Sequence, residues 1–254
     1  MLNGLFATRA ADRTCLAGLA PLFPPPVSPE RPQIFRSTPV HSRGSSSLLA
    51  LLFVCFVSFV LSPLRAAEAN LKTIVFFGDS LTAGYGLEDP ATEAYPARIE
   101  QKIEAAHLPY RVVNAGLSGE TTAGGLRRVD WILRQPIDIF VLALGGNDGL
   151  RGIEPAVTRA NLQGIVDRVR AKYPDIQVVL AGMMIPPSMG QDYAREFAAL
   201  YPELAKKNHT AFVPFLLKGV GGSEDLNQAD RIHPTAKGHA ILAKTVWQIL
   251  RPLL

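Results

Sequence analysis

Short apolar runs alternate with longer stretches of helical periodicity from residue 70 to the end of the chain. Five of the runs are rich in β-branched residues and have the length of buried strands. These predicted strands are Lys72–Phe77, Arg111–Asn114, Ile137–Leu144, Ile176–Ala181 and Ala211–Val213. Elsewhere apolar residues recur at the spacing of one helix face. The predicted helices are Tyr95–Ala106, Thr121–Leu133, Pro155–Lys172, Asp192–Lys207 and Thr235–Leu250.

This alternation is typical of a parallel sheet that helices cover on both faces. Pro155 falls in the first turn of one predicted helix and Pro174 just beyond its end, where helices tolerate proline. No internal repeat or linker divides residues 70–254. The pattern therefore predicts one α/β domain, a three-layer α/β/α sandwich with a flavodoxin-like five-stranded parallel sheet in the order 2-1-3-4-5.

The first 69 residues have a different pattern. Residues 1–43 contain seven prolines and no periodic apolar face, so we expect a disordered leader there. Residues 48–61 are apolar apart from one serine; Arg43 precedes them and Ala67-Glu68-Ala69 follows. A charged start, an apolar core and a small-residue cleavage site are the three parts of a secretory signal peptide. A retained membrane anchor is the alternative, but this run is shorter than the ~20 apolar residues of a spanning helix.

The chain is therefore expected to have three segments: the leader 1–43, a cleaved signal peptide at 44–69 and the α/β domain at 70–254. The leader is longer than the usual charged start of a signal peptide, which suggests the hypothesis that translation begins downstream of Met1, near Val40. These assignments predict that the mature protein is periplasmic or secreted.

Charge and cysteine content exclude several classes of protein. The net charge of +4 belongs largely to residues 1–69, and the rest of the chain holds 20 basic and 19 acidic residues, which gives no reason to expect a nucleic-acid partner. Both cysteines, Cys15 and Cys55, precede residue 70, so the domain needs no disulfide. Its histidines lack metal-ligand spacing. We expect a monomer that acts on a small molecule with no metal and no cofactor.

Three predicted strands are each followed by a glycine-containing polar motif: Gly78-Asp79-Ser80, Gly116-Leu117-Ser118-Gly119-Glu120 and Gly145-Gly146-Asn147-Asp148-Gly149. The carboxyl ends of strands form the ligand crevice of an open parallel sheet, and the first three strands are neighbours in the order 2-1-3-4-5. A fourth motif, Asp230-Arg231-Ile232-His233-Pro234, follows a long segment without clear periodicity. We expect the four motifs to converge.

The residue types in these motifs fit acyl transfer. Ser80 at a strand end is the candidate nucleophile, His233 the base that takes its proton, and Asp230 the carboxylate that fixes the imidazole tautomer. A tetrahedral intermediate needs donors aimed at its oxyanion. The candidate donors are the backbone N–H groups of Ser80 and Gly119 and the side chain of Asn147.

Alternatives exist for several of these residues. Asp225 is a second candidate carboxylate, although it lies five residues further from His233, and Ser118 is a second serine without supporting spacing. Taken alone, Ser80 would simply cap a helix. The residues expected to hold the site loops by hydrogen bonds, without taking part in chemistry, are Asp79, Asn114 and Asp148. The histidines expected to be solvated or in the core are His107, His209 and His239.

Together the motifs Gly78-Asp79-Ser80-Leu81, the Gly119 turn, Gly146-Asn147-Asp148 and Asp230-x-x-His233-Pro234 resemble the four signature blocks of the SGNH (GDSL) hydrolases. The similarity runs from about residue 72 to residue 250, and residues 145–152 (GGNDGLRG) resemble the periplasmic acyl-thioesterase, lysophospholipase and arylesterase subgroup. The resemblance implies the same triad and oxyanion donors. Two positions depart from the best-known members: Glu120 replaces an aspartate, and no aromatic residue accompanies Met189.

The expected function is hydrolysis of carboxylic esters and thioesters, including lysophospholipids, through an acyl-serine intermediate. One alternative is a carbohydrate O-acetyl esterase with the same triad, and another is a non-catalytic ligand-binding module. No Gly-x-Ser-x-Gly motif is present, which disfavours the larger α/β-hydrolase family. Four aliphatic residues favour a lipid-like acyl chain unless they belong to the core: Leu87, Ile185, Leu216 and Leu217.

Overall fold

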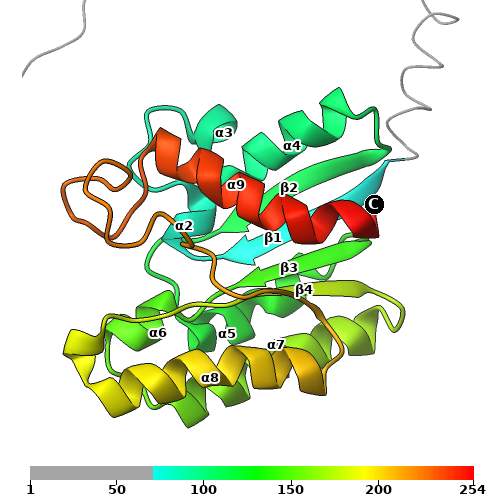
Figure 1. Ribbon diagram of the computed structural model, residues 1–254. Helices are drawn as coiled ribbons and strands as arrows, with labels where there is room; N and C mark the ends of the chain where they lie inside the picture. Colours follow the sequence, from blue (N-terminus) through cyan, green and yellow to red (C-terminus); the bar gives the residue numbers. More distant parts are fainter. Residues whose placement is uncertain (1–70) are drawn as a thin grey trace, which may run out of the picture. The chain divides into compact units, whose positions relative to one another are not determined.

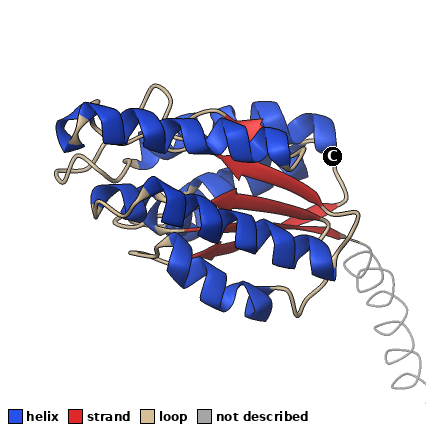
Figure 2. Ribbon diagram, turned by 90° about the horizontal axis from the view of Figure 1, so that it is seen from below, coloured by secondary structure: helices blue, strands red, loops and turns tan. Residues whose placement is uncertain are grey.

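The computed structural model of the protein describes residues 71–254, which form a five-stranded parallel sheet with helices on both faces (Figures 1 and 2). The strand order is β2-β1-β3-β4-β5, as the sequence predicted. The strands are β1 (Lys72–Gly78), β2 (Tyr110–Gly116), β3 (Ile139–Ala143), β4 (Gln177–Ala181) and β5 (Ala211–Val213). All five predicted strands are confirmed, with ends that differ by at most a few residues.

Helices α4 and α9 cover one face of the sheet, and α5, α7 and α8 cover the other (Figure 1). The longer helices are α4 (Tyr95–Ala105), α5 (Thr122–Ile132), α7 (Pro155–Lys172), α8 (Gln191–Lys207) and α9 (Ala236–Leu250). Local signals set their starts, since the hydroxyls of Thr121 and Thr235 cap α5 and α9. Short elements that the sequence did not predict are α2 (Ser80–Ala83), α3 (Pro90–Glu93), α6 (Gly146–Leu150) and the 3-10 turns Pro187–Met189 and Arg251–Leu253.

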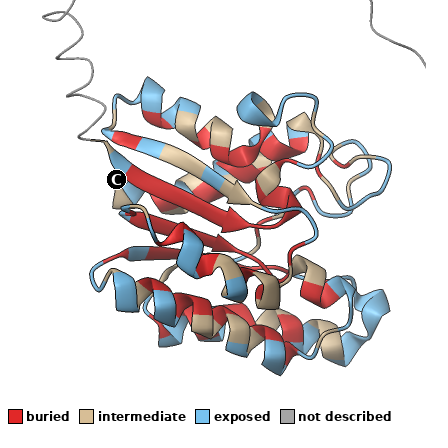
Figure 3. Cartoon of the chain, turned by 180° about the vertical axis from the view of Figure 1, so that it is seen from behind, coloured by how far each residue is buried: buried red, intermediate tan, exposed pale blue. Residues whose placement is uncertain are grey.

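The core lies along the middle strands (Figure 3). Residues 74–77 of β1 are fully buried, because helices cover the strand on both faces. Strand β2 at the edge of the sheet keeps several exposed or half-buried positions. This difference explains why the apolar run of β1 is continuous and that of β2 is not.

The register of the sheet places three strand ends side by side. Gly78 at the end of β1 pairs with Gly116 of β2 and with Ala143 of β3. Helix α2 packs directly on the end of β2, because a Cβ atom at Gly116 would stand 2.3 Å from the backbone nitrogen of Ala83. The segments that follow these strands therefore leave the sheet at one edge.

The predicted leader (residues 1–43) and signal peptide (residues 44–69) lie outside the described residues. Within residues 71–254, no helix has the length and apolar character needed to cross a membrane.

Candidate active site

Ser80 lies at the junction between β1 and α2, where the buried strand turns into a helix. Asp79 caps this helix, since its Oδ1 atom accepts a hydrogen bond of 3.0 Å from the backbone N–H of Leu81. Ser80 is 9% exposed, so most of its surface is buried. The cap and the end of β1 together fix the position of the side chain.

The three residues predicted as a triad form one chain of hydrogen bonds. Oγ of Ser80 is 2.8 Å from Nε2 of His233, and Nδ1 of His233 is 2.6 Å from Oδ2 of Asp230. Both contacts are satisfied when Nδ1 carries the proton and donates to Asp230, so that Nε2 accepts from the serine hydroxyl. In this tautomer the imidazole is ready to take the proton of Ser80.

The loop between β5 and α9 carries His233 across to Ser80, on the side of the sheet where α2 begins (Figure 1). Asn227 anchors the loop, because its side chain donates to the carbonyls of Val220 and Ser223, each at 2.7 Å. Arg231 has a φ of 62°, a left-handed conformation that is uncommon for residues other than glycine. This bend turns the chain so that Asp230 and His233 face one another.

Asp230 is held in its charged form. Its partial burial by itself would raise the pKa, but hydrogen bonds from the His233 backbone and side chain and from the Ile232 backbone outweigh burial and lower the pKa to about 2. Oδ1 accepts the backbone N–H groups of Ile232 and His233 at 2.9 and 3.0 Å. The carboxylate is therefore both oriented and ionised at neutral pH.

The three candidate oxyanion donors lie on the segments that follow β1, β2 and β3. Gly119 has a φ of +77° in a turn that the Glu120 N–H closes on the Leu117 carbonyl at 3.1 Å. Nδ2 of Asn147 donates to the Glu120 carbonyl at 3.0 Å. Within residues 71–254, the backbone N–H groups of Ser80 and Gly119 have no hydrogen-bond acceptor. Both are thus available to a bound molecule.

The three residues expected to hold the loops make such contacts. Asp148 is fully buried and accepts the backbone N–H of Thr122 at 2.8 Å, which ties α6 to α5. Nδ2 of Asn114 donates to the Thr82 carbonyl at 2.8 Å, which ties β2 to α2. Burial raises the pKa of Asp79 to about 7, although the Leu81 N–H and the nearby His233 act in the opposite direction.

The other candidates lie away from this chain of hydrogen bonds. Ser118 and Asp225 are exposed, and His233 contacts Asp230 instead. His239 is buried in α9, where Nδ1 accepts the Tyr95 backbone N–H at 3.2 Å. Burial, assisted by the positive charge of Arg98 and by His233, lowers the pKa of His239 to about 4. The exposed histidines are His107 and His209.

Two of the aliphatic residues considered for an acyl groove belong to the core. Ile185 and Leu216 are 6% and 1% exposed and pack within the main hydrophobic cluster. They were candidates because they are aliphatic, and in the fold both belong to the hydrophobic core. Leu87 and Leu217 are half-buried and keep some accessible surface.

Two further side chains contact the site, and the sequence analysis did not single them out. The Tyr85 ring packs on the imidazole of His233, with 4.7 Å between the ring centroids. Tyr85 itself is 54% exposed, so the contact lies near the surface of the molecule. Arg128 of α5 forms an ion pair with Glu120, the residue after Gly119. The contact of Tyr85 with His233 joins segments that are distant in sequence, whereas Arg128 and Glu120 are eight residues apart.

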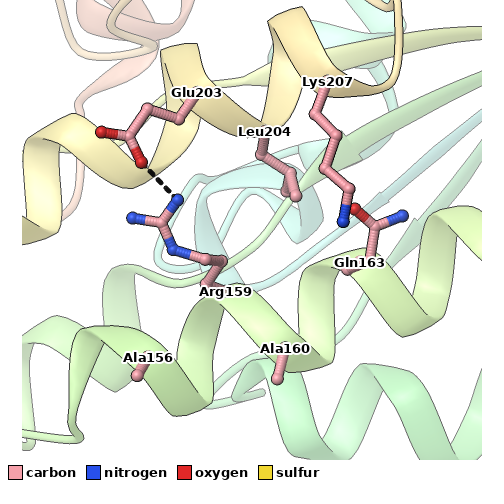
Figure 4. A pocket seen from close by; sticks show the side chains of 7 residues that line it. All are labelled: Ala156, Arg159, Ala160, Gln163, Glu203, Leu204 and Lys207. Carbon is pink, nitrogen blue, oxygen red and sulfur yellow. Dashed lines mark hydrogen bonds and ion pairs between the residues drawn. The ribbon is translucent and has the colours of Figure 1, made fainter.

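A surface depression between α7 and α8 is unrelated to these residues (Figure 4). It has a volume of about 200 Å³, and Arg159 and Glu203 pair across it. None of the triad residues or candidate oxyanion donors lines it. The structure contains no cluster of metal-ligating side chains within residues 71–254.

Comparison with known proteins identifies the family of this chain. A model of the GDSL-like Lipase/Acylhydrolase family matches residues 76–241. The chain is 38% identical over 192 residues to Esterase TesA of Pseudomonas aeruginosa, covering 75% of this chain and 94% of the relative. It is 36% identical over 200 residues to Thioesterase 1/protease 1/lysophospholipase L1 of Escherichia coli strain K12, covering 78% and 92%. A crystal structure of TesA aligns with a TM-score of 0.68 at 39% identity, covering 72% of this chain and 100% of that one. The chain therefore belongs to the GDSL-like lipase/acylhydrolase family, the SGNH hydrolases.

Proposed function

We propose that Ser80, His233 and Asp230 are the catalytic triad of an esterase and thioesterase. The observation that carries this proposal is the hydrogen-bonded chain from the Ser80 hydroxyl through the His233 imidazole to the Asp230 carboxylate, at 2.8 and 2.6 Å. Nucleophile, base and orienting group stand in the order that nucleophilic catalysis by serine requires.

In the proposed acylation step, Nε2 of His233 takes the Ser80 proton while Oγ attacks the carbonyl carbon of the substrate. Asp230, with a pKa of about 2, stays ionised and stabilises the imidazolium that forms. The imidazolium then gives its proton to the departing alcohol or thiol. In the second step His233 takes a proton from a water molecule that attacks the acyl carbon. The bond to Oγ then breaks, the carboxylic acid leaves, and the imidazolium returns its proton to Oγ of Ser80.

We assign the oxyanion hole to the backbone N–H groups of Ser80 and Gly119 and to the second N–H of the Asn147 amide, whose first N–H binds the Glu120 carbonyl. Preorganised donors stabilise the charge that develops on the carbonyl oxygen, and the loss of one costs about a hundredfold to a thousandfold in turnover. Three donors from three neighbouring strand ends support this assignment.

The exposed apolar side chains favour a substrate with a long acyl chain over an acetylated carbohydrate. Within residues 71–254, six of the eight exposed large hydrophobic residues lie on the segments that leave the carboxyl edge of the sheet or on the triad loop. They are Tyr85, Leu117, Leu150, Met184, Met189 and Ile232. Exposed apolar side chains at the edge of the sheet that carries Ser80 suit medium or long acyl groups, including those of lysophospholipids.

Hydrolysis of p-nitrophenyl esters of increasing chain length tests the proposal. We expect wild-type enzyme to prefer medium or long acyl groups, and Ser80→Ala to lose turnover on all of them. Activity on acetate alone would support a carbohydrate O-acetyl esterase instead. Equal turnover by Ser80→Ala would contradict the triad.

We also propose that residues 44–69 are a cleaved signal peptide and that the mature enzyme acts in the periplasm or outside the cell. The support is the order of Arg43, the apolar residues 48–61 and Ala67-Glu68-Ala69. N-terminal sequencing of the exported protein should find a start near Asn70. An intact N-terminus recovered with the membrane fraction would support a retained anchor.

A further inference from the structure

Arg128 of α5 joins the ends of two strands to the turn that carries Gly119. Its Nε atom donates to both carboxylate oxygens of Glu120, at 2.8 and 2.7 Å, and its Nη2 atom also contacts Glu120. The same Nη2 atom donates to the Ala115 carbonyl of β2 at 2.8 Å and approaches the Gly78 carbonyl of β1 at 3.4 Å. The guanidinium lies 4.1 Å from the centroid of the Phe77 ring.

Stability alone is a weak explanation for this ion pair. The side chain of Glu120 is 3% exposed and that of Arg128 is 22% exposed. Removing two charges from water costs free energy that their attraction often only offsets, so apolar side chains of similar volume would stabilise the fold about as well. The bidentate geometry instead fixes where Glu120 lies.

Glu120 in turn links two of the proposed oxyanion donors. It directly follows Gly119, and its N–H closes the turn on the Leu117 carbonyl at 3.1 Å. Its carbonyl accepts the Asn147 amide at 3.0 Å. A displacement of Glu120 would therefore move the Gly119 N–H and the Asn147 side chain together.

We propose that Arg128 is a positioning residue of the oxyanion hole and acts through Glu120. This inference rests on the proposed function, since it presumes that Gly119 and Asn147 stabilise an oxyanion. Donors act in the transition state only if they are already in place, and a misplacement of about 1 Å can cost about a hundredfold in rate. The guanidinium meets this requirement because its planar fork holds the carboxylate in one orientation.

The chain offers a matched control. Arg168 of α7 pairs with Asp130 at 2.9 Å and donates to the Leu126 carbonyl at 2.8 Å. It thus makes the same two kinds of contact as Arg128, an ion pair and a bond to a carbonyl, with no contact to the turn at Gly119.

The experiment compares Arg128→Met, Arg128→Lys and Arg168→Met by kcat and KM on one p-nitrophenyl ester, with thermal unfolding of each protein. We expect Arg128→Met to lose kcat about 10- to 100-fold with KM changed less than about threefold. Arg128→Lys should fall in between, because an ammonium keeps the charge but not the bidentate fork. Arg168→Met should keep wild-type kcat.

A double-mutant cycle with Asn147→Ala separates positioning from general support of the fold. If Arg128 acts on the same hole, Arg128→Met should cost markedly less in the Asn147→Ala background than in the wild type. The inference would be overturned if the kcat loss of the double variant equalled the product of the two single losses. It would also be overturned if Arg128→Met had a kcat within about twofold of wild type. If Arg128→Met does not fold, Arg128→Lys and Glu120→Gln enter the same cycle with the same criteria. The triad is tested separately: if Ser80→Ala abolishes turnover, the proposed triad is supported whatever the result for Arg128.

Discussion

His239 should make the fold sensitive to mild acid. The imidazole is 1% exposed, and its Nδ1 atom accepts the backbone N–H of Tyr95. Because Nδ1 can accept this bond only without a proton, the folded state requires the neutral imidazole. Burial, assisted by the positive charge of Arg98 and by the nearby His233, lowers the pKa of His239 to about 4, from about 6.5 in the unfolded chain. As the pH falls through this window, the unfolded state gains a proton that the folded state does not bind, and the folded state loses stability.

The two pKa values set the size of the effect. At about 1.4 kcal/mol for each pKa unit, the full shift corresponds to about 3 kcal/mol, and roughly 2 kcal/mol of it is lost between pH 7 and pH 5. His239→Asn retains an acceptor near the position of Nδ1 but cannot take up a proton. The free energy of unfolding of this variant should therefore fall by about 2 kcal/mol less than that of wild type over the same pH range.

Urea unfolding at a series of pH values measures this difference, with the fluorescence of Trp247, which packs against the core on α9, as the reporter. His209→Asn, the same substitution at an exposed histidine, controls for the change of side chain itself. If wild type and His239→Asn lose stability in parallel from pH 7 to pH 5, the assignment of a neutral, buried His239 is wrong.

Three further substitutions follow from the geometry. Asp230→Asn should lower kcat about 10⁴-fold, because the imidazole would no longer be held in the required tautomer. Asp225→Asn should leave kcat unchanged, and a reversed result would identify Asp225 as the carboxylate of the triad. Tyr85→Ala should lower kcat/KM by up to about tenfold, since an aromatic contact contributes roughly 1 kcal/mol. Tyr85→Phe, which keeps the ring, should remain near wild type, and an equal loss in both variants would refute the packing role. Gly116→Ala should destabilise the fold by about 1–3 kcal/mol in thermal unfolding, because its Cβ would stand 2.3 Å from the Ala83 backbone nitrogen. Gly221→Ala, whose Cβ would meet its neighbours at 3.5 Å or more, is the control that should be nearly neutral.

The sheet and its order were predictable because each strand is short, apolar and followed by a helix. The positions of Gly78, Gly116 and Ala143 at paired strand ends then bring their motifs together. Helices α2, α3 and α6 were not predicted, because four or five residues are too few to show a helical period. Ile185 and Leu216 are aliphatic, as residues that line an acyl groove would be, and only the packing of the fold reveals that both are in the core.

The sequence could have shown that Arg128 needs a buried partner, but not which residue that partner is. It lies on the same face of α5 as Gly125, Val129 and Ile132, all buried against the sheet. A charged residue on such a face needs a buried partner. Which carboxylate serves as the partner depends on the turn after β2, which places the side chain of Glu120 beside Arg128. The contact between Tyr85 and His233 likewise depends on the conformations of two loops, which the sequence pattern does not predict.

The most direct test of the central claim is to map a fluorophosphonate adduct on the enzyme by peptide mass spectrometry, because such a probe reacts with a serine whose hydroxyl is activated by a base. The geometry predicts a single adduct on Ser80, no adduct in Ser80→Ala and a strongly slowed reaction in His233→Ala. An adduct on another residue, or equal labelling of wild type and Ser80→Ala, would contradict the proposal that Ser80 is the nucleophile.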